Sequence, residues 1–210
     1  MLYDTLGKDY RRRRVPDPRV ASAIHGALGT EGTVVNVGAG AGAYEPENRC
    51  VAAIEPSLTM IRQRPSSAAP AIQALASHLP LRENCVDVAM AILTVHHWTD
   101  RTQALCELGR VARRRVVFLT WDPDGPAFWL TEEYFPEIRE RDRAAFPALS
   151  ELARIYGRIR SVPVPIPYDC SDGFMGAYWR RPAEYLNPDV RAGMSGFSKI
   201  GAVGTCLRYA

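Results

Sequence analysis

The chain has 210 residues, of which 47% are hydrophobic and 23% are charged, a balance that is typical of a globular domain and argues against disorder. The net charge of +3 is too small to indicate nucleic-acid binding by itself. The sequence contains no apolar run of about 18 residues, so no membrane span is predicted. The charged N-terminus lacks the apolar segment of a signal peptide. We expect one cytoplasmic domain, with a core over about 15–120 and a lid with C-terminal excursions over about 121–199.

The cysteines argue against a metal site. They show neither CxxC spacing nor an even count. We therefore expect neither a zinc site nor a disulfide framework. We expect the cysteines to be reduced thiols. The five cysteines are Cys50, Cys85, Cys106, Cys170 and Cys206.

The N-terminal segment is polar and carries Tyr3 and Tyr10, followed by the basic run Arg11–Arg14. Such a run is either a solvated helix or loop, or a flap over an anionic group of a ligand. Both interpretations remain open at this stage.

A helix and two strands follow. Pro18 suits the first turn of a helix and Gly29 can end it, which predicts a helix over about 18–28. The β-prone runs Val34–Val37 and Val51–Ile54 then predict the first two strands.

The connection between these strands is short and rich in glycine. Only 13 residues separate Val37 from Val51, whereas a parallel crossover normally carries a helix. Roughly one turn fits, at about 44–48, so no helix dipole can serve there as the main anchor of an anion. Three glycines at alternate positions lie in this connection: Gly38, Gly40 and Gly42.

An acid, Glu55, ends the second strand. A carboxylate there can accept hydrogen bonds from both hydroxyls of a ribose, so the loop and the acid together indicate a nucleoside-containing cofactor. The residues from Gly38 to Ala43 satisfy both GxGxG and GxGxxA, which leaves S-adenosylmethionine and a dinucleotide open. Because a pyrophosphate needs a genuine helix after the loop, the short connection favours S-adenosylmethionine.

The next elements alternate between strand and helix. We predict a short helix at 56–64, a third strand at Ala71–Ala76 (whose composition also suits a helix), a fourth strand at Val86–Leu93, a helix from Thr99-Asp100 to about Arg110 and a fifth strand at Val116–Thr120. This alternation predicts an α/β fold, a Rossmann-like, doubly wound, mostly parallel sheet.

After the fifth strand the pattern becomes irregular. Residues 121–160 fit an inserted helical lid, and the alternating prolines of Val162–Pro167 allow at most an edge strand or an extended segment. Residues 168–199 form a second excursion over the site, and 202–209 are a weak candidate for a last strand. The aromatic residues of these excursions either enclose an acceptor or pack the insertion: Trp121, Phe128, Trp129, Phe174 and Trp179.

Three segments in this order carry a resemblance: Leu79-Pro80-Leu81, Asp87 in the fourth strand, and Thr94-Val95-His96-His97-Trp98-Thr99-Asp100. With the glycine loop and Glu55, they resemble the class I S-adenosylmethionine-dependent methyltransferases, most closely the UbiE-like small-molecule branch. The resemblance covers about residues 30–120, and the opening from Tyr3 to Tyr10 is similar to the N-terminal cap of that family.

The resemblance implies S-adenosylmethionine as cofactor and a methyl acceptor of small size. We expect neither nucleic acid nor a membrane as partner, and a monomer or homodimer as the assembly. Tyr3, Tyr10 and Arg14 would cover the cofactor. Its implied binding residues are Gly38, Ala39, Gly40, Gly42, Glu55, Pro56, Ser57, Met60, Ala76, Ser77, Leu93 and Thr94, and its implied catalytic residues are His96, His97 and Tyr10.

Several alternatives remain. Met60 can border the adenine or pack in the core. A histidine of the His96-His97 pair can accept a proton from the nucleophile, or the pair can brace its turn. Asn36 stands where the family usually has an acid, and Leu75-Ala76-Ser77 lacks the acid common after the third strand. These departures and the short connection leave open a non-catalytic cofactor-binding protein, while a nicotinamide oxidoreductase and an RNA methyltransferase are further alternatives.

Overall fold

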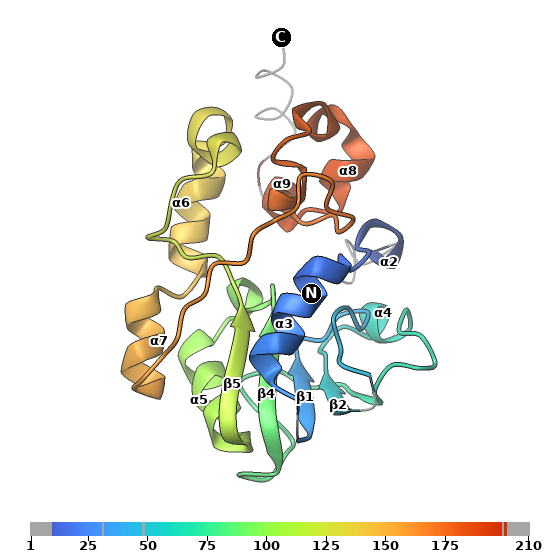
Figure 1. Cartoon of the computed structure of the whole chain (residues 1–210), viewed down its shortest axis with the longest axis vertical. Helices are drawn as coiled ribbons and strands as arrows, with labels where there is room; N and C mark the ends of the chain where they lie inside the picture. Colours follow the sequence, from blue (N-terminus) through green and yellow to red (C-terminus); the bar gives the residue numbers. More distant parts are fainter. Residues whose placement is uncertain (1–9, 31, 48, 199, 201–210) are drawn as a thin grey trace.

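The computed structural model describes residues 10–30, 32–47, 49–198 and 200, and its centre is a five-stranded parallel sheet (Figure 1). The strand order is β3-β2-β1-β4-β5. All pairings are parallel, so the predicted Rossmann-like α/β fold is confirmed. The strands are β1 (Val34–Val37), β2 (Cys50–Ile54), β3 (Ala71–Ile72), β4 (Val86–Ile92) and β5 (Ala112–Leu119).

Two strands differ from the prediction. The third has only two residues instead of six, because the chain after Ile72 leaves the sheet and lines a cavity with Leu75, Ala76 and Ser77. The fifth begins at Ala112 rather than Val116, since β5 lies at the edge of the sheet and can hold exposed arginines there.

Helices cover both faces of the sheet, as the continuous apolar strands require. Successive side chains of a strand point to opposite faces. Val34 and Met90 therefore pack against helix α3 (Pro18–Leu28), whereas Val35 and Ala89 face helix α5 (Arg101–Val111).

The helix ends follow the predicted signals. Asp17 caps α3 by accepting a hydrogen bond from the N–H of Arg19 at 2.9 Å, and Gly29 ends it with a φ of +75°. Asp100 caps α5 through the N–H of Gln103. Helix α4 (Leu58–Ile61) is shorter than the predicted helix at 56–64, because its cap is Ser57 and the chain turns at residues 62–63.

A second layer lies beyond the carboxyl ends of the strands, at the top of Figure 1. We call residues 128–146 and 174–198 the cap. It has its own apolar core of Leu130, Phe135, Ile138, Tyr185, Met194 and Phe197, separate from the two cores of the sheet. Its elements are η2 (Leu130–Tyr134), α6 (Pro136–Ala145), η3 (Met175–Tyr178), η4 (Pro182–Leu186), α8 (Pro188–Ala192) and α9 (Ser195–Ser198).

Part of the predicted lid belongs to the sheet layer instead. Helix α7 (Leu149–Tyr156) packs beside α5, where Leu152 is buried and the hydroxyl of Tyr156 donates to the carbonyl of Leu105 at 2.6 Å. The segment Val162–Pro167 is extended and forms no strand, and its Val164 and Ile166 pack on the α3 face. The candidate strand at 202–209 lies outside the described residues.

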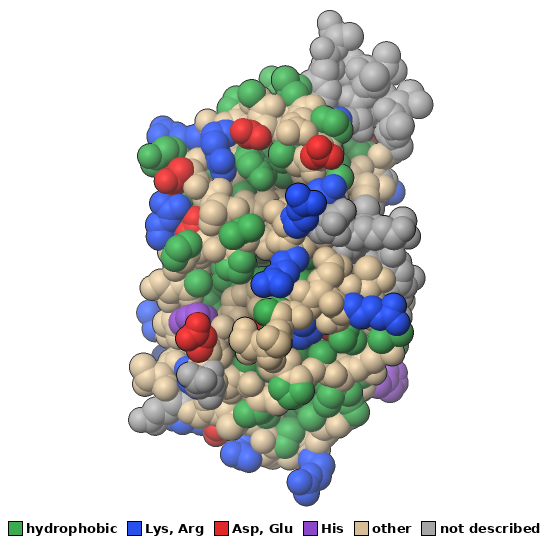
Figure 2. Space-filling view, turned by 90° about the vertical axis from the view of Figure 1, so that its right-hand side faces the viewer, with side chains coloured by type: hydrophobic (Ala, Val, Ile, Leu, Met, Phe, Trp, Pro, Cys, Tyr) green, Lys and Arg blue, Asp and Glu red, His purple; other side chains and the backbone are tan. Residues whose placement is uncertain are grey.

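The connection from β1 to β2 contains no helix in its described residues, 38–47 and 49, as its length predicts. Tyr44, in this connection, has a φ of +63°. In the part of the chain that the structure describes, no helix is long and apolar enough to cross a membrane. The Lys and Arg side chains on the face shown in Figure 2 are scattered and form no continuous stripe.

Candidate active site

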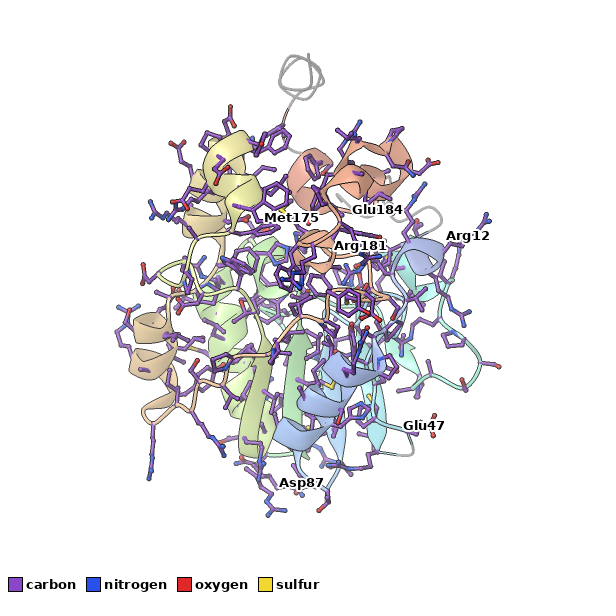
Figure 3. All side chains as sticks on the ribbon, turned by 45° about the horizontal axis from the view of Figure 1, so that its top comes forward. Arg12, Glu47, Asp87, Met175, Arg181 and Glu184 are labelled. Atoms are coloured by element: carbon purple, nitrogen blue, oxygen red, sulfur yellow. The ribbon has the colours of Figure 1, made fainter. Side chains whose placement is uncertain are left out.

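A cavity of about 510 Å³ lies at the carboxyl ends of the strands. This is the edge at which open α/β sheets bind ligands. Asp87, in contrast, lies at the opposite end of the sheet and accepts hydrogen bonds from Thr33 (Figure 3). The sequence-predicted residues that line the cavity are Tyr10, Gly38, Ala39, Gly40, Glu55, Pro56, Ser57, Met60, Ala76, Ser77, Leu93, Thr94 and His97.

Two predicted site residues lie elsewhere. Gly42 is not part of the cavity wall, and a side chain there would meet the guanidinium of Arg64 at 3.3 Å. His96 lines a second, neighbouring cavity. Tyr3 lies outside the described residues.

The glycine loop brings its backbone close to the other walls of the cavity. Gly38 has a φ of +71°, and a Cβ there would lie 2.1 Å from Oγ1 of Thr94. Gly40 has a φ of +53°, and its Cβ would lie 3.2 Å from Cε of Met60. Gly38 is therefore favoured both by conformation and by space, whereas Gly40 is favoured by its conformation.

Glu55 lies at the cavity wall, is only 6% exposed and is held by two hydrogen bonds. Its Oε2 accepts the N–H of Gly40 at 2.8 Å, and its Oε1 accepts the N–H of Ser57 at 2.9 Å. A carboxylate oxygen can accept a second hydrogen bond, so the pair of oxygens suits a vicinal diol.

A buried ion pair braces the loop where the crossover helix is missing. The guanidinium of Arg64 donates to both carboxylate oxygens of Glu45, at 2.8 and 2.9 Å, and their side chains are 5% and 8% exposed. Arg64 also donates to the carbonyl of Gly40. The loop is thus anchored by charge rather than by a helix.

Asn36 completes this brace. Its Nδ2 donates to Oε1 of Glu45 at 3.0 Å, so an acid at this position would face a second carboxylate. Its Oδ1 is buried and has no hydrogen-bond partner among the described residues. Asn36 is also one of the residues that line the cavity.

We expect Glu45→Gln to lower the free energy of unfolding by about 3 kcal/mol, because it leaves a buried guanidinium without its counter-charge. Thermal or denaturant unfolding of the ligand-free protein measures this change. The matched control is Glu47→Gln, an exposed carboxylate of the same loop, which should leave stability unchanged. Equal stability of the two variants would contradict the proposed brace.

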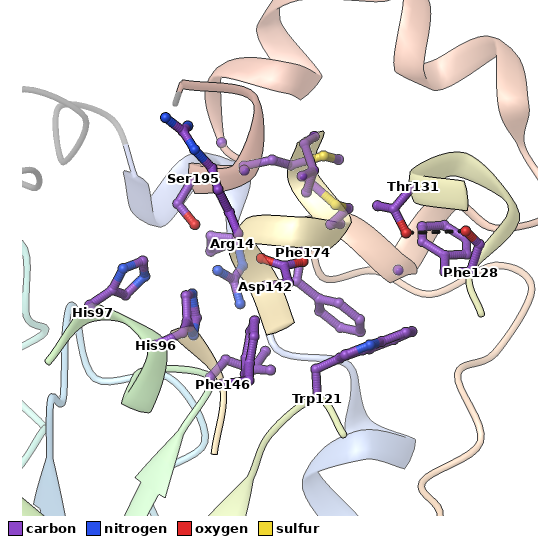
Figure 4. A pocket seen from close by; sticks show the side chains of 18 residues that line it. Arg14, His96, His97, Trp121, Phe128, Thr131, Asp142, Phe146, Phe174 and Ser195 are labelled. Carbon is purple, nitrogen blue, oxygen red and sulfur yellow. Dashed lines mark hydrogen bonds between the residues drawn. The ribbon is translucent and has the colours of Figure 1, made fainter. Parts of the chain in front are cut away.

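The second cavity, of about 110 Å³, lies between the cap and the sheet (Figure 4). It shares Arg14, Leu93 and His97 with the first cavity, so the two adjoin. Its walls are mostly apolar or aromatic, with a few polar groups. The other lining residues are His96, Trp121, Phe128, Thr131, Ile138, Arg141, Asp142, Phe146, Phe174, Met175, Gly176, Gly193, Met194, Ser195 and Gly196.

The two histidines differ in position. They lie on the 3-10 turn η1 (Val95–His97), which follows Leu93, where a φ of +52° turns the chain out of the sheet. The ring of His96 stacks on Phe146, with centroids 4.3 Å apart. Of the two histidines, His97 alone lines both cavities, which places it where two ligands would meet.

The aromatic residues of the excursions divide between the two interpretations. Trp121, Phe128 and Phe174 line the second cavity. Trp129 packs against Tyr185 in the cap, and its indole donates to the carbonyl of Trp179.

Sequence reasoning found Phe128 and Phe174 but missed the other cap residues of the second cavity, and it missed the Glu45–Arg64 pair. The cap helices are short and show no periodicity that would reveal an inward face, and Glu45 and Arg64 are joined only by tertiary structure. No group of three His, Cys, Asp or Glu residues in the described chain is placed to hold a metal ion.

The chain is similar to known proteins in sequence and in fold. Residues 35–120 match the family model described as a methyltransferase domain. A candidate methyltransferase from an antibiotic biosynthesis pathway of Anabaena variabilis is similar in structure, with a TM-score of 0.81 and 32% identity over 94% of this chain and 86% of that chain.

Two more distant structures share the fold. A methyltransferase of Thermotoga maritima, described as S-adenosylmethionine-dependent and a possible histamine N-methyltransferase, has a TM-score of 0.58 and 20% identity over 73% of this chain and 77% of its own. A candidate methyltransferase of Bacillus halodurans has a TM-score of 0.51 and 16% identity over 67% and 66%. A comparison with curated proteins gives no match.

Proposed function

Because this chain belongs to the class I S-adenosylmethionine-dependent methyltransferases, with S-adenosylmethionine as its cofactor, we propose that it methylates an O, N or C atom of a small molecule held in the second cavity. The observation that carries the proposal is the adjoining of the two cavities at Arg14, Leu93 and His97. The finer placement in the UbiE-like branch, action as a monomer or homodimer, and independence from nucleic acid are parts of the same proposal.

The residues of the first cavity fit the cofactor. Glu55 presents two fixed oxygens to the ribose diol, and Oδ1 of Asn36 can accept a hydrogen bond from the ammonium of the methionine portion. Gly38 and Gly40 leave room for close approach of the backbone. We assign binding to these residues together with Ala39, Pro56, Ser57, Met60, Ala76, Ser77, Leu93 and Thr94.

When bound, S-adenosylmethionine supplies an electrophilic methyl group whose leaving group is a neutral thioether. The protein then has to hold the acceptor in line and exclude water, which positioning alone can do. Trp121, Phe128 and Phe174 supply the apolar walls for this purpose. His97 accepts the proton when the acceptor is a hydroxyl or an amine.

We expect His97→Gln to lower kcat about a hundredfold for a hydroxyl or amine acceptor, because the base at the shared wall is lost. S-adenosylhomocysteine affinity, measured by calorimetry, should change little. His96→Gln, at a residue that lines the second cavity and not the first, should act mainly on the KM of the acceptor. A larger kcat loss in His96→Gln than in His97→Gln would contradict the assignment of the base.

The function itself is tested by isotopically labelled methyl transfer to a panel of small phenols, amines and activated carbon acids. Transfer to a member of the panel supports the proposal. Tight binding of S-adenosylhomocysteine without transfer to any acceptor would favour the alternative of a non-catalytic binding protein. The amide of Asn36, at a position where the family usually has an acid, is the reason for this alternative. Transfer to RNA alone would replace the small-molecule acceptor.

A further inference from the structure

One buried carboxylate joins three segments around the two cavities. Asp172 is 1% exposed and accepts hydrogen bonds from Nε of Arg14 at 2.5 Å and from its Nη2 at 3.2 Å. It also accepts the hydroxyl of Tyr44 at 2.7 Å and the N–H of Gly173 at 2.7 Å. Donors from the N-terminal segment, the glycine loop and its own segment therefore converge on it.

Each of these segments reaches a cavity. Arg14 lines both cavities, and its Nη1 also donates to the hydroxyl of Tyr10 at 2.6 Å. Tyr44 lines the first cavity, and Phe174, two residues after Asp172, lines the second. Arg14 thus lies where the two cavities meet, and Asp172 is the buried carboxylate that holds it there.

Neighbouring groups hold the pair in place. Burial, followed by the negative charge of Asp172, raises the pKa of Tyr44, so the phenol keeps its proton and goes on donating. The segment is fixed further by the N–H of Ser171, which donates to Asp17 at 3.1 Å. Gly173 lies directly against the carbonyl of Arg13, where a Cβ would approach to 2.1 Å.

The charge at the boundary between the two cavities has a consequence for the cofactor. If methyl transfer runs from the first cavity into the second, as the proposed function requires, the sulfonium lies near that boundary. An arginine is a permanent cation and, in surroundings of low dielectric constant, would repel the sulfonium unless a nearby anion offset it.

We propose that Asp172 is the positioning counter-ion of Arg14 which allows the site to accept the cationic S-adenosylmethionine beside a guanidinium. The inference rests on the proposed function, because only transfer across the shared wall places the sulfonium there. It predicts that the pair controls discrimination between the cationic cofactor and its neutral product, S-adenosylhomocysteine.

Calorimetric titration with the two ligands separately tests the inference on the intact protein. Asp172→Asn should weaken S-adenosylmethionine about tenfold more than S-adenosylhomocysteine, because the arginine loses its counter-charge. Arg14→Gln should shift the ratio of the two affinities the other way, since it leaves the carboxylate in place. The matched control is Asp169→Asn, a half-exposed carboxylate of the same segment that pairs with Arg19 and should leave the ratio unchanged.

A purely structural role would weaken both ligands equally in Asp172→Asn, and that result overturns the inference. Equal loss of both ligands in Arg14→Gln also overturns it, since the arginine would then bind a group common to both. Should Asp172→Asn not fold, the shift of the ratio in Arg14→Gln decides. The titrations need no methyl acceptor. If the ratio of the two affinities shifts but no methyl transfer is found, only the proposed function is refuted. If methyl transfer is found but the ratio does not shift, only the inference is refuted.

Discussion

Replacing Glu55 with alanine should weaken S-adenosylmethionine binding about a hundredfold. The ribose would lose its two hydrogen bonds to the carboxylate. A hydrogen bond to a charged group contributes about 1.5–3 kcal/mol to the binding free energy. The substitution also removes the acceptors of the Gly40 and Ser57 N–H groups, which loosens the loop. Calorimetric titration measures the affinity, and circular dichroism shows whether the fold is retained.

The control for this substitution is Asp87→Ala at the opposite end of the sheet. It removes a carboxylate that also accepts backbone and side-chain hydrogen bonds, from Thr33, so it should reduce stability. Its affinity for the cofactor should not change. Unchanged affinity in Glu55→Ala, or equal losses in the two variants, would show that the diol is bound elsewhere.

Gly38→Ala should reduce both stability and binding. The residue has a φ of +71°, which costs an L-residue about 1–2 kcal/mol, and its Cβ would overlap Oγ1 of Thr94. Relief of that overlap costs about 1–3 kcal/mol more. We therefore expect the free energy of unfolding to fall by about 3 kcal/mol and cofactor binding to become undetectable, as measured by denaturant unfolding and calorimetry.

Gly26→Ala provides the matched control for Gly38→Ala. Gly26 lies inside helix α3, and a Cβ there would meet no atom within 4 Å. Alanine should accordingly stabilise the protein by about 0.5–1 kcal/mol without affecting binding. If Gly38→Ala were as well tolerated as Gly26→Ala, the close contact between the loop and Thr94 would be wrong.

The parts of the fold that local patterns encode could be predicted from the sequence. The bounds of β1 and α3 follow from a β-branched run and from the signals at Pro18 and Gly29. The missing crossover helix follows from the count of residues between Val37 and Val51.

The parts that depend on distant residues could not be predicted. Asp172 meets Arg14 across 158 positions, and no spacing in the sequence connects them. Helix α7 has an apolar face, yet whether this face covers the site or packs on α5 is decided only by tertiary packing at Leu152. Likewise, the sequence shows only that Asn36 replaces an acid. The structure adds that Asn36 donates a hydrogen bond to Glu45.

The separate apolar core of the cap has a consequence for how enzymes of this build diverge. Leu130, Ile138 and Met194 stabilise the cap without contributing to either core of the sheet. Substitutions in the cap can therefore reshape the second cavity, which we propose holds the acceptor, while the first cavity keeps its form. Related chains can therefore acquire a different methyl acceptor through substitutions in the cap alone.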